Sequence, residues 1–210
     1  MDAVTVGSPL EGQWWVGHGG HAELVNYHYP ATTQRDALDI MQVVDGRIHR
    51  PDSTDLTSYY YIYDQPVLAP TDGTVTFALD SRPDQPIGSV DSQYPTGNHL
   101  VIDIGGGHYL LMSHLRQGSI AVNVGERVTE GQPIARVGNS GASSAPHVHI
   151  QAQTLPTGIT DIRTIDGPQL LKTLRTYPLL FRGASLVRGS NESWPTAVDP
   201  RRGDFVRPTR

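Results

Sequence analysis

The sequence contains no cysteine, which removes three kinds of chemistry at once. Without thiols the chain can form neither a cysteine-ligated zinc site nor a disulfide, and it has no thiol nucleophile. Any metal must therefore be bound by histidine nitrogens and carboxylate oxygens. The absence of cysteine fits both cytosolic and exported enzymes and does not choose between them.

Long apolar runs and clustered positive charge are also missing. No apolar run approaches the roughly 20 residues that a membrane-spanning helix requires. The acidic opening Met1-Asp2-Ala3 is not typical of a signal peptide. The net charge is −5 and no stripe of Lys and Arg offsets it, which argues against a nucleic-acid partner. Basic residues gather only near the C-terminus, where we expect a solvated tail: Arg201, Arg202, Arg207 and Arg210.

Glycine and proline are plentiful, with 22 and 16 in 210 residues. Short apolar runs alternate with turn-forming residues about every 8–12 positions, a spacing typical of a sandwich or barrel. We therefore expect an all-β fold, an antiparallel β-sandwich or barrel-like sheet with few short helices. The sequence predicts an irregular segment over residues 1–25, a single domain over 26–181 and an extended tail over 182–210.

Three local features refine this expectation. Gly105-Gly106-Gly107 lies between two apolar runs and predicts a hairpin turn, because glycine readily adopts positive φ. Residues 81–97 hold three prolines and predict a surface loop beside the active site. Residues 166–175 carry a weak helical pattern.

The tripeptide His147-Val148-His149 is the most informative feature among the nine histidines. Side chains alternate between the two faces of a strand, so His147 and His149 point to the same face. A metal ligand and a proton-transfer group can therefore lie side by side without a helix to organise them.

Three upstream residues could complete a zinc site and its catalytic groups. His28 lies in a polar-aromatic segment, and Asp39 lies inside the apolar run 37–41, where a carboxylate is costly unless a cation holds it. A catalytic zinc needs three N or O ligands and one open position, and His28, Asp39 and His149 satisfy that count. His147 and His114, which ends a long apolar run, remain for proton transfer and oxyanion stabilisation.

Each of these residues has an alternative interpretation. His28 could be a surface loop histidine, and His114 a packed histidine at the end of a strand. Asp39 could be a buried carboxylate paired with Arg35 or Arg47. We expect His49, His99 and His108 to be structural or exposed.

These residues resemble the lysostaphin/LytM-type zinc metallopeptidases, peptidase family M23. Beyond His28 and Asp39, the motifs that carry the resemblance are Leu111-Met112-Ser113-His114-Leu115, the lipoyl-like stretch 122–141 and Pro146-His147-Val148-His149. The resemblance covers roughly residues 26–152 and implies a sheet built on a duplicated, lipoyl-like hybrid motif. It also implies that Asp39 and His149 bind Zn²⁺, that His147 is the catalytic neighbour and that His114 assists it.

The sequence departs from the family at the first ligand. The family usually has H-x-x-x-D, and the position of that histidine is here Arg35. The nearest substitute is His28, eleven positions before Asp39, and a loop of that length closes at small entropic cost. His18 and His21 are weaker substitutes, and Asp36 is a rival carboxylate.

The expected function is therefore a zinc-dependent endopeptidase that hydrolyses peptide bonds in bacterial cell-wall peptidoglycan. Its partners would be the peptide cross-links, with no nucleic acid and no membrane span. The protein would act as a monomer outside the cytoplasm, whether extracellular, periplasmic or associated with the cell wall.

One alternative is a non-catalytic LytM-like protein that binds peptidoglycan or activates a hydrolase. A lipoyl or biotinyl carrier would need a lysine at a hairpin tip, but the single lysine, Lys172, lies far from the lipoyl-like stretch. A sugar-phosphotransferase component would need two facing histidines but no acidic ligand such as Asp39.

Overall fold

The computed structural model describes residues 2–52, 56–155 and 174–209, and nearly all of its regular structure is strand. One turn of 3₁₀ helix, η1 (Thr57–Tyr59), is the helical element of the described residues. No helix in this part of the chain has the length and apolar character needed to cross a membrane. The all-β prediction is confirmed, whereas most of the weak helical pattern at 166–175 lies outside the described residues.

The described residues form sixteen strands. Their bounds are β1 (Val4–Val6), β2 (Trp14–His18), β3 (Leu38–Met41), β4 (Pro66–Leu68), β5 (Gly73–Leu79), β6 (Asn98–Gly105), β7 (His108–Leu115), β8 (Arg127–Val128), β9 (Pro133–Arg136), β10 (Val148–Gln153), β11 (Thr176–Tyr177), β12 (Leu179–Arg182), β13 (Ala184–Arg188), β14 (Asn191–Ser193), β15 (Ala197–Val198) and β16 (Phe205–Pro208).

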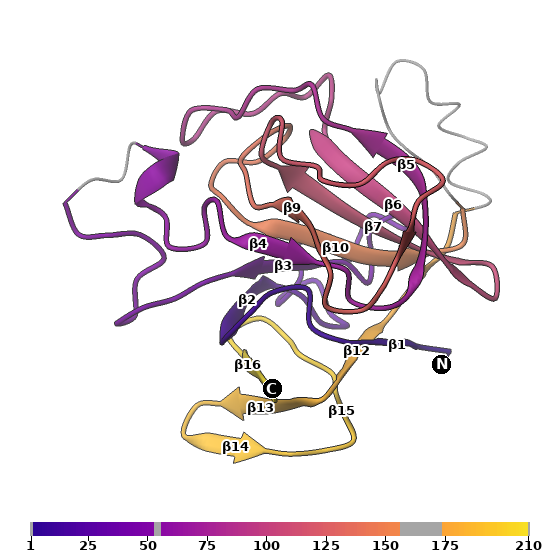
Figure 1. Cartoon of the computed structure of the whole chain (residues 1–210). Helices are drawn as coiled ribbons and strands as arrows, with labels where there is room; N and C mark the ends of the chain where they lie inside the picture. The colour runs from indigo at the N-terminus through magenta and orange to yellow at the C-terminus, as the bar shows by residue number, and fades with distance from the viewer. Residues whose placement is uncertain (1, 53–55, 156–173, 210) are drawn as a thin grey trace.

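One long antiparallel sheet organises the molecule. Its strand order is β14-β13-β16-β2-β3-β10-β7-β6-β5-β8, with β11 added to β10. Strands β4 and β9 form a separate antiparallel pair, and β1, β12 and β15 form a third small sheet in which β1 and β12 run parallel. Figure 1 shows β4 and β9 over the face of β10, β7 and β6.

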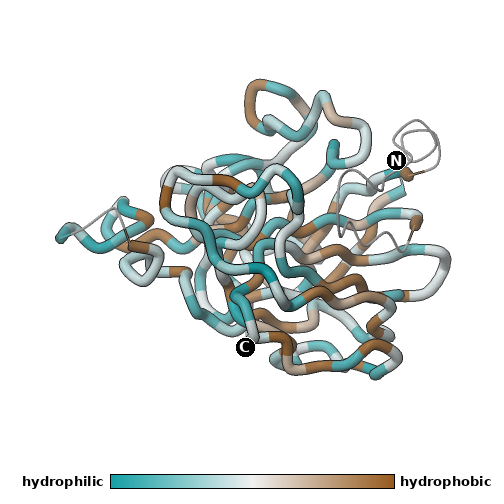
Figure 2. Tube along the Cα trace, turned by 90° about the horizontal axis from the view of Figure 1, so that it is seen from above, coloured by the Kyte–Doolittle hydropathy of each residue, from teal (hydrophilic) through white to brown (hydrophobic). Residues whose placement is uncertain are grey.

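Alternation of side chains along β10 separates the core from the functional face. Val148, Ile150 and Ala152 are fully buried and pack in one cluster with Ile134 of β9 and Val67 of β4. Apolar stretches recur along the strands that cross the middle of the molecule (Figure 2). The intervening residues of β10 point to the opposite face, because successive strand side chains alternate. That face holds the polar residues described below.

The predicted turn and loop agree with the structure. Gly105, Gly106 and Gly107 all have positive φ, between 63° and 84°, and they join β6 to β7. Residues 81–97 contain no strand, as expected of a loop. Two residues of this loop, Pro95 and Thr96, reach the cavity above the polar face of β10.

Both ends of the chain are more regular than predicted. The segment 1–25, expected to be irregular, contains β1 and β2, and the stretch 182–210, expected to be an extended tail, contains β13–β16. Strand β16 pairs with β2, and the ring of Phe181 on β12 contacts that of Trp14 on β2 at 5.1 Å between centroids. Packing between distant segments stabilises these short strands, whose local sequence is rich in Gly, Pro and Arg. The division of the chain into domains stays a prediction.

Candidate metal centre

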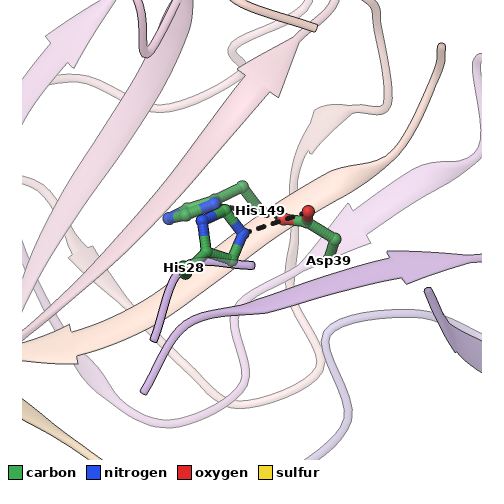
Figure 3. A group of neighbouring side chains, drawn as sticks. All are labelled: His28, Asp39 and His149. Atoms are coloured by element: carbon green, nitrogen blue, oxygen red, sulfur yellow. Dashed lines mark hydrogen bonds and ion pairs between the residues drawn. The ribbon is translucent and has the colours of Figure 1, made fainter. Parts of the chain in front are cut away.

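Three elements bring the predicted ligands together. Asp39 lies on β3 and His149 on β10, and the two are paired residues of adjacent antiparallel strands. His28 comes from the turns between β2 and β3 and reaches over the same face. In Figure 3 the side chains of His28, Asp39 and His149 converge. One ligand atom from each lies within 4.8 Å of the others, and all three residues are buried.

The carboxylate of Asp39 turns one oxygen to each imidazole. Its Oδ2 lies 3.1 Å from Nε2 of His28, and its Oδ1 lies 3.2 Å from Nδ1 of His149. Two neutral imidazoles and one carboxylate form a donor set typical of catalytic zinc, which keeps a fourth position open. Nε2 of His28 is also buried with no aligned hydrogen-bond partner among the described residues. The residues present therefore fit a zinc ion.

Burial and neighbouring charges shift the pKa values of these ligands in opposite directions. Burial raises the pKa of the Asp39 carboxyl, but His147, His149 and His28 outweigh that effect and hold the pKa well below its ordinary value. Burial lowers the pKa of His28, and the nearby Asp39 carboxylate only partly offsets it. An ionised carboxylate beside a neutral imidazole is the protonation state in which both groups bind a metal.

A buried asparagine organises the turns that carry His28. The Asn26 side chain donates from Nδ2 to the carbonyls of Gly20 and Arg35, at 3.1 and 3.0 Å, and its Oδ1 accepts from the backbone N–H of His28 at 3.1 Å. Asn26 is fully buried, so these bonds are shielded from water. This role cannot be read from the sequence, since the bonded groups are backbone atoms as far as eleven residues away.

Tyr27 is a second residue that sequence analysis missed. Its hydroxyl donates to Oδ2 of Asp39 at 3.0 Å, and its ring packs against that of His28 with 3.9 Å between centroids. Burial and the Asp39 carboxylate raise the pKa of Tyr27, so the hydroxyl keeps its proton and remains a donor. This bond orients the carboxylate between the two histidines.

His147 lies beside the three ligands with one nitrogen held by the backbone. Its Nδ1 is 2.8 Å from the carbonyl of Ala145 and 3.2 Å from Oγ of Ser143. A carbonyl can only accept, so Nδ1 carries a proton, and the lone pair of the neutral ring lies on Nε2. That Nε2 lies 3.5 Å from Oδ1 of Asp39 and has no hydrogen-bond partner among the described residues.

His114 adopts a backbone conformation that is unusual for a histidine. Its φ is +63°, in the left-handed region, and the backbone bonds of its N–H to the Thr96 carbonyl and of its carbonyl to the Gly138 N–H hold it there. The side chain leaves the regular alternation of β7, and its ring centroid comes within 4.6 Å of that of His147. Nδ1 donates to the carbonyl of Ser140 at 2.9 Å. Burial, then the neighbouring His147 and His149, hold the pKa of His114 well below its ordinary value.

The weaker candidates lie away from this cluster or outside its ligand set. Arg35, at the usual position of the first histidine, stacks over the ring of Tyr29 and donates to its backbone carbonyl. Asp36 accepts from the Thr176 hydroxyl, and His21 contacts Asp199. His18 packs edge-on against Tyr27, and its Nδ1 is not among the clustered ligand atoms. Asp39 contacts no arginine in the described residues, so the interpretation as a structural Asp–Arg pair is wrong.

A cavity of about 200 Å³ opens over the site. It exposes His28, His114 and His149 to incoming molecules, and the polar side of β7 and β10 forms its floor. Further lining residues are Tyr27, Thr33, Gln34, Pro95, Thr96, Leu111, Ser113, Ala142, Gln151, Gln153 and Leu174.

Comparison with solved structures finds similar proteins of low identity, whereas no curated protein matches the sequence. One is a Pseudomonas aeruginosa protein assigned to family M23, at 18% identity and TM-score 0.43, covering 70% of this chain and 44% of that one. Another is the catalytic domain of the antimicrobial peptidase lysostaphin from Staphylococcus simulans, at 22% identity and TM-score 0.42, covering 77% and 93%. A third is a mutant catalytic domain of the prophage-encoded M23 protein EnpA from Enterococcus faecalis, at 20% identity and TM-score 0.37, covering 60% and 97%.

The family model matches half of the chain. The model of peptidase family M23 aligns with residues 56–160, which include His114, His147 and His149. The match begins after His28 and Asp39, and the geometry of the structure brings these two predicted ligands to the matched histidines. The chain belongs to peptidase family M23.

Proposed function

We propose that this protein is a zinc-dependent endopeptidase that hydrolyses peptide bonds in bacterial cell-wall peptidoglycan. The observation that carries the proposal is the convergence of His28, Asp39 and His149, with His147 and His114 beside them. Three ligands and two further histidines can supply the metal site and the acid–base groups that metal-assisted hydrolysis of an amide uses. The substrate lies in the cell wall, so the protein acts outside the cytoplasm.

His28, Asp39 and His149 would hold the ion. Zinc bound there supplies a Lewis acid for the scissile carbonyl and lowers the pKa of a water molecule to about 7. Asp39 keeps its charge in the buried site, which offsets part of the charge of the ion. Tyr27 keeps the carboxylate oriented between the two imidazoles.

His147 is the proposed general base. Its proton lies on Nδ1, which is tied to the Ala145 carbonyl, so Nε2 faces the site with a lone pair. Taking up a proton at Nε2 converts the ring to an imidazolium beside Asp39, which stabilises that charge at 3.5 Å. A positioned base of this kind contributes on the order of 10²- to 10⁴-fold to a rate.

His114 is the proposed acid and oxyanion-stabilising group. Nδ1 donates to the Ser140 carbonyl, so Nε2 can donate only after it has taken up a proton. Burial lowers the pKa of this ring, so a proton that Nε2 takes up from the attacking water, by way of His147, would pass readily to the leaving amine. The small cavity that His114 lines suits a peptide whose residues at the cleaved bond have small side chains.

The direct test combines metal content with hydrolysis of purified peptidoglycan. We expect about one zinc per chain by elemental analysis and release of new amino groups from the wall. His149→Ala should abolish both. His114→Ala should retain zinc and lose hydrolysis on the order of 10²-fold or more, because His114 lies outside the ligand set.

Two outcomes would contradict the proposal. A His149→Ala variant with full hydrolysis would remove the metal centre from the mechanism. A wild-type protein that sediments with peptidoglycan but binds no zinc would support the non-catalytic alternative instead.

A further inference from the structure

The segment between His28 and Asp39, residues 29–38, also supplies hydrogen-bond partners for His28 and His149. It contributes Gln34 to His28 and the carbonyl of Thr33 to a chain of amides that ends at His149. The nitrogens contacted are those that do not face Asp39. These contacts determine which nitrogen of each imidazole carries the proton.

At His28 the contact is direct. Nε2 faces the Asp39 carboxylate, and Nδ1 lies 3.0 Å from Oε1 of Gln34. A neutral imidazole has one N–H and one lone pair, and only the nitrogen with the lone pair can bind a metal. If the Gln34 oxygen accepts from Nδ1–H, the lone pair lies on Nε2, toward the other two ligands.

At His149 the roles of the two ring nitrogens are exchanged relative to His28. Nδ1 faces Oδ1 of Asp39 at 3.2 Å, and Nε2 lies 3.1 Å from Oε1 of Gln151. Here the proton must lie on Nε2 for Nδ1 to be the metal ligand. The orientation of the Gln151 amide therefore decides whether His149 can bind.

The Thr33 carbonyl determines that orientation. The NH₂ group of Gln151 lies 3.1 Å from the Thr33 carbonyl and 2.6 Å from Oε1 of Gln153. A backbone carbonyl can only accept, so the atom of Gln151 that faces it must be the amide nitrogen. The carbonyl oxygen of Gln151 is thereby turned to His149, where it accepts from Nε2–H. Gln151 is 2% exposed, and water does not compete for these bonds.

We propose that residues 29–38 set the tautomers in which both histidine ligands bind the metal. Gln34 holds the proton of His28 on Nδ1, and Thr33, through Gln151, holds the proton of His149 on Nε2. This inference rests on the proposed zinc site. Gln34 and Gln151 are positioning residues, since neither contributes a ligand atom. Hydrogen-bond partners of this kind typically change metal affinity about 10- to 100-fold.

The first test reads the tautomers of the zinc-loaded wild-type protein without substrate. Histidine ¹⁵N–¹H correlation spectra at mildly alkaline pH distinguish protonated from unprotonated ring nitrogens. We expect Nδ1–H for His28 and Nε2–H for His149. The opposite tautomer at either ring would overturn the inference, even if the protein binds zinc and hydrolyses peptidoglycan.

The second test measures metal affinity by competition with a chromophoric chelator. Gln34→Leu should weaken zinc binding about 10- to 100-fold, whereas Gln34→Glu, which still accepts, should bind as the wild type does. Gln151→Leu should also weaken binding, with thermal unfolding used to confirm that the variant is folded. The matched control is Gln117→Leu, which removes an exposed glutamine bonded to the Ser81 carbonyl.

Either of two results would reject the role of Gln34. One is a Gln34→Leu variant that binds zinc as tightly as the control. The other is a Gln34→Glu variant that binds no better than Gln34→Leu, because the inference requires an acceptor at this position. A wild-type protein that binds no zinc would instead count against the proposed function.

Discussion

Four side chains converge on the two oxygens of the Asp39 carboxylate. His28 and Tyr27 face Oδ2, and His147 and His149 face Oδ1. The pKa of Asp39 lies below its ordinary value of 3.8, so in the metal-free protein its contribution to stability is present above that pH. It is lost as the pH falls through the lowered value. The site is thus preorganised by contacts to one carboxylate.

Tyr27→Phe tests the orientation of that carboxylate. The change removes only the hydroxyl that donates to Oδ2 of Asp39. We expect zinc affinity to fall about tenfold, by analogy with other hydrogen-bond partners of metal ligands, while the fold is retained. Competition titration with a chelator measures the change.

Tyr29→Phe is the matched control for Tyr27. Its ring keeps the contact with the Arg35 guanidinium, and it does not touch Asp39. Equal zinc affinities for the two variants would show that the Tyr27 hydroxyl does not orient the ligand.

At the residue scale, the five predicted site residues could be found from the sequence, because chemistry and alternation along a strand mark them. The structure brings all five together, and their roles stay predictions. Asn26, Tyr27, Gln34 and Gln151 could not be found in this way. Their partners are set by how the loop 26–37 folds against β10, which no local pattern records.

At the scale of the element, β6 carries a buried histidine that the proposed chemistry does not use. The ring of His99 stacks on Phe77 of β5 with 5.0 Å between centroids, and Nδ1 donates to the carbonyl of Gly97. Burial lowers the pKa of His99 to about 4. In the unfolded chain the ordinary value is 6.5, so the unfolded state takes up the proton first as the pH falls.

His99 should therefore make the fold sensitive to acid. Its contribution to the free energy of unfolding declines as the pH falls from 6.5 to about 4, by about 3 kcal/mol in total. His99→Phe keeps an aromatic ring beside Phe77 and has no group to titrate. Urea unfolding at about pH 7 and about pH 4.5 should show a smaller acid loss for the variant than for the wild type. Identical losses would contradict this role of His99.

Strand prediction succeeded where the strands are long and apolar. Strands β6, β7 and β10 have six to eight residues. The first two are the apolar runs on either side of the predicted hairpin turn at 105–107, and the third overlaps the strand predicted at His147-Val148-His149. The missed strands β13–β16 have two to five residues, several of them exposed. Such strands form because β16 pairs with β2, far earlier in the chain, as in Phe205 opposite Trp15.

At the scale of the whole molecule, strands from the two ends of the chain pair with each other next to the strand that carries Asp39. Strand β16 pairs with β2, β2 with β3, and β3 carries Asp39. The fully buried rings of Trp14 and Phe181 join these strands to the small sheet of β1, β12 and β15. The order of strands could not be predicted from the sequence, because local periodicity does not specify distant pairing.

Phe181→Ala tests whether the chain ends belong to the same cooperative fold. Removing a fully buried phenylalanine should lower the free energy of unfolding by about 3–5 kcal/mol. Trp194→Ala, at a side chain that is mostly exposed, should change it by less than about 0.5 kcal/mol. Denaturant unfolding followed by far-UV circular dichroism compares the two. Equal stabilities would mean that the terminal strands contribute little to the fold.

The most direct test of the central claim is an anomalous difference map collected at the zinc edge from crystals of the zinc-loaded protein. The account predicts one peak bounded by Nε2 of His28, the carboxylate of Asp39 and Nδ1 of His149, with His147 and His114 beside it but not coordinating. A peak held by His18, His21 or Asp36, or no peak in the cluster of His28, Asp39 and His149, would contradict it.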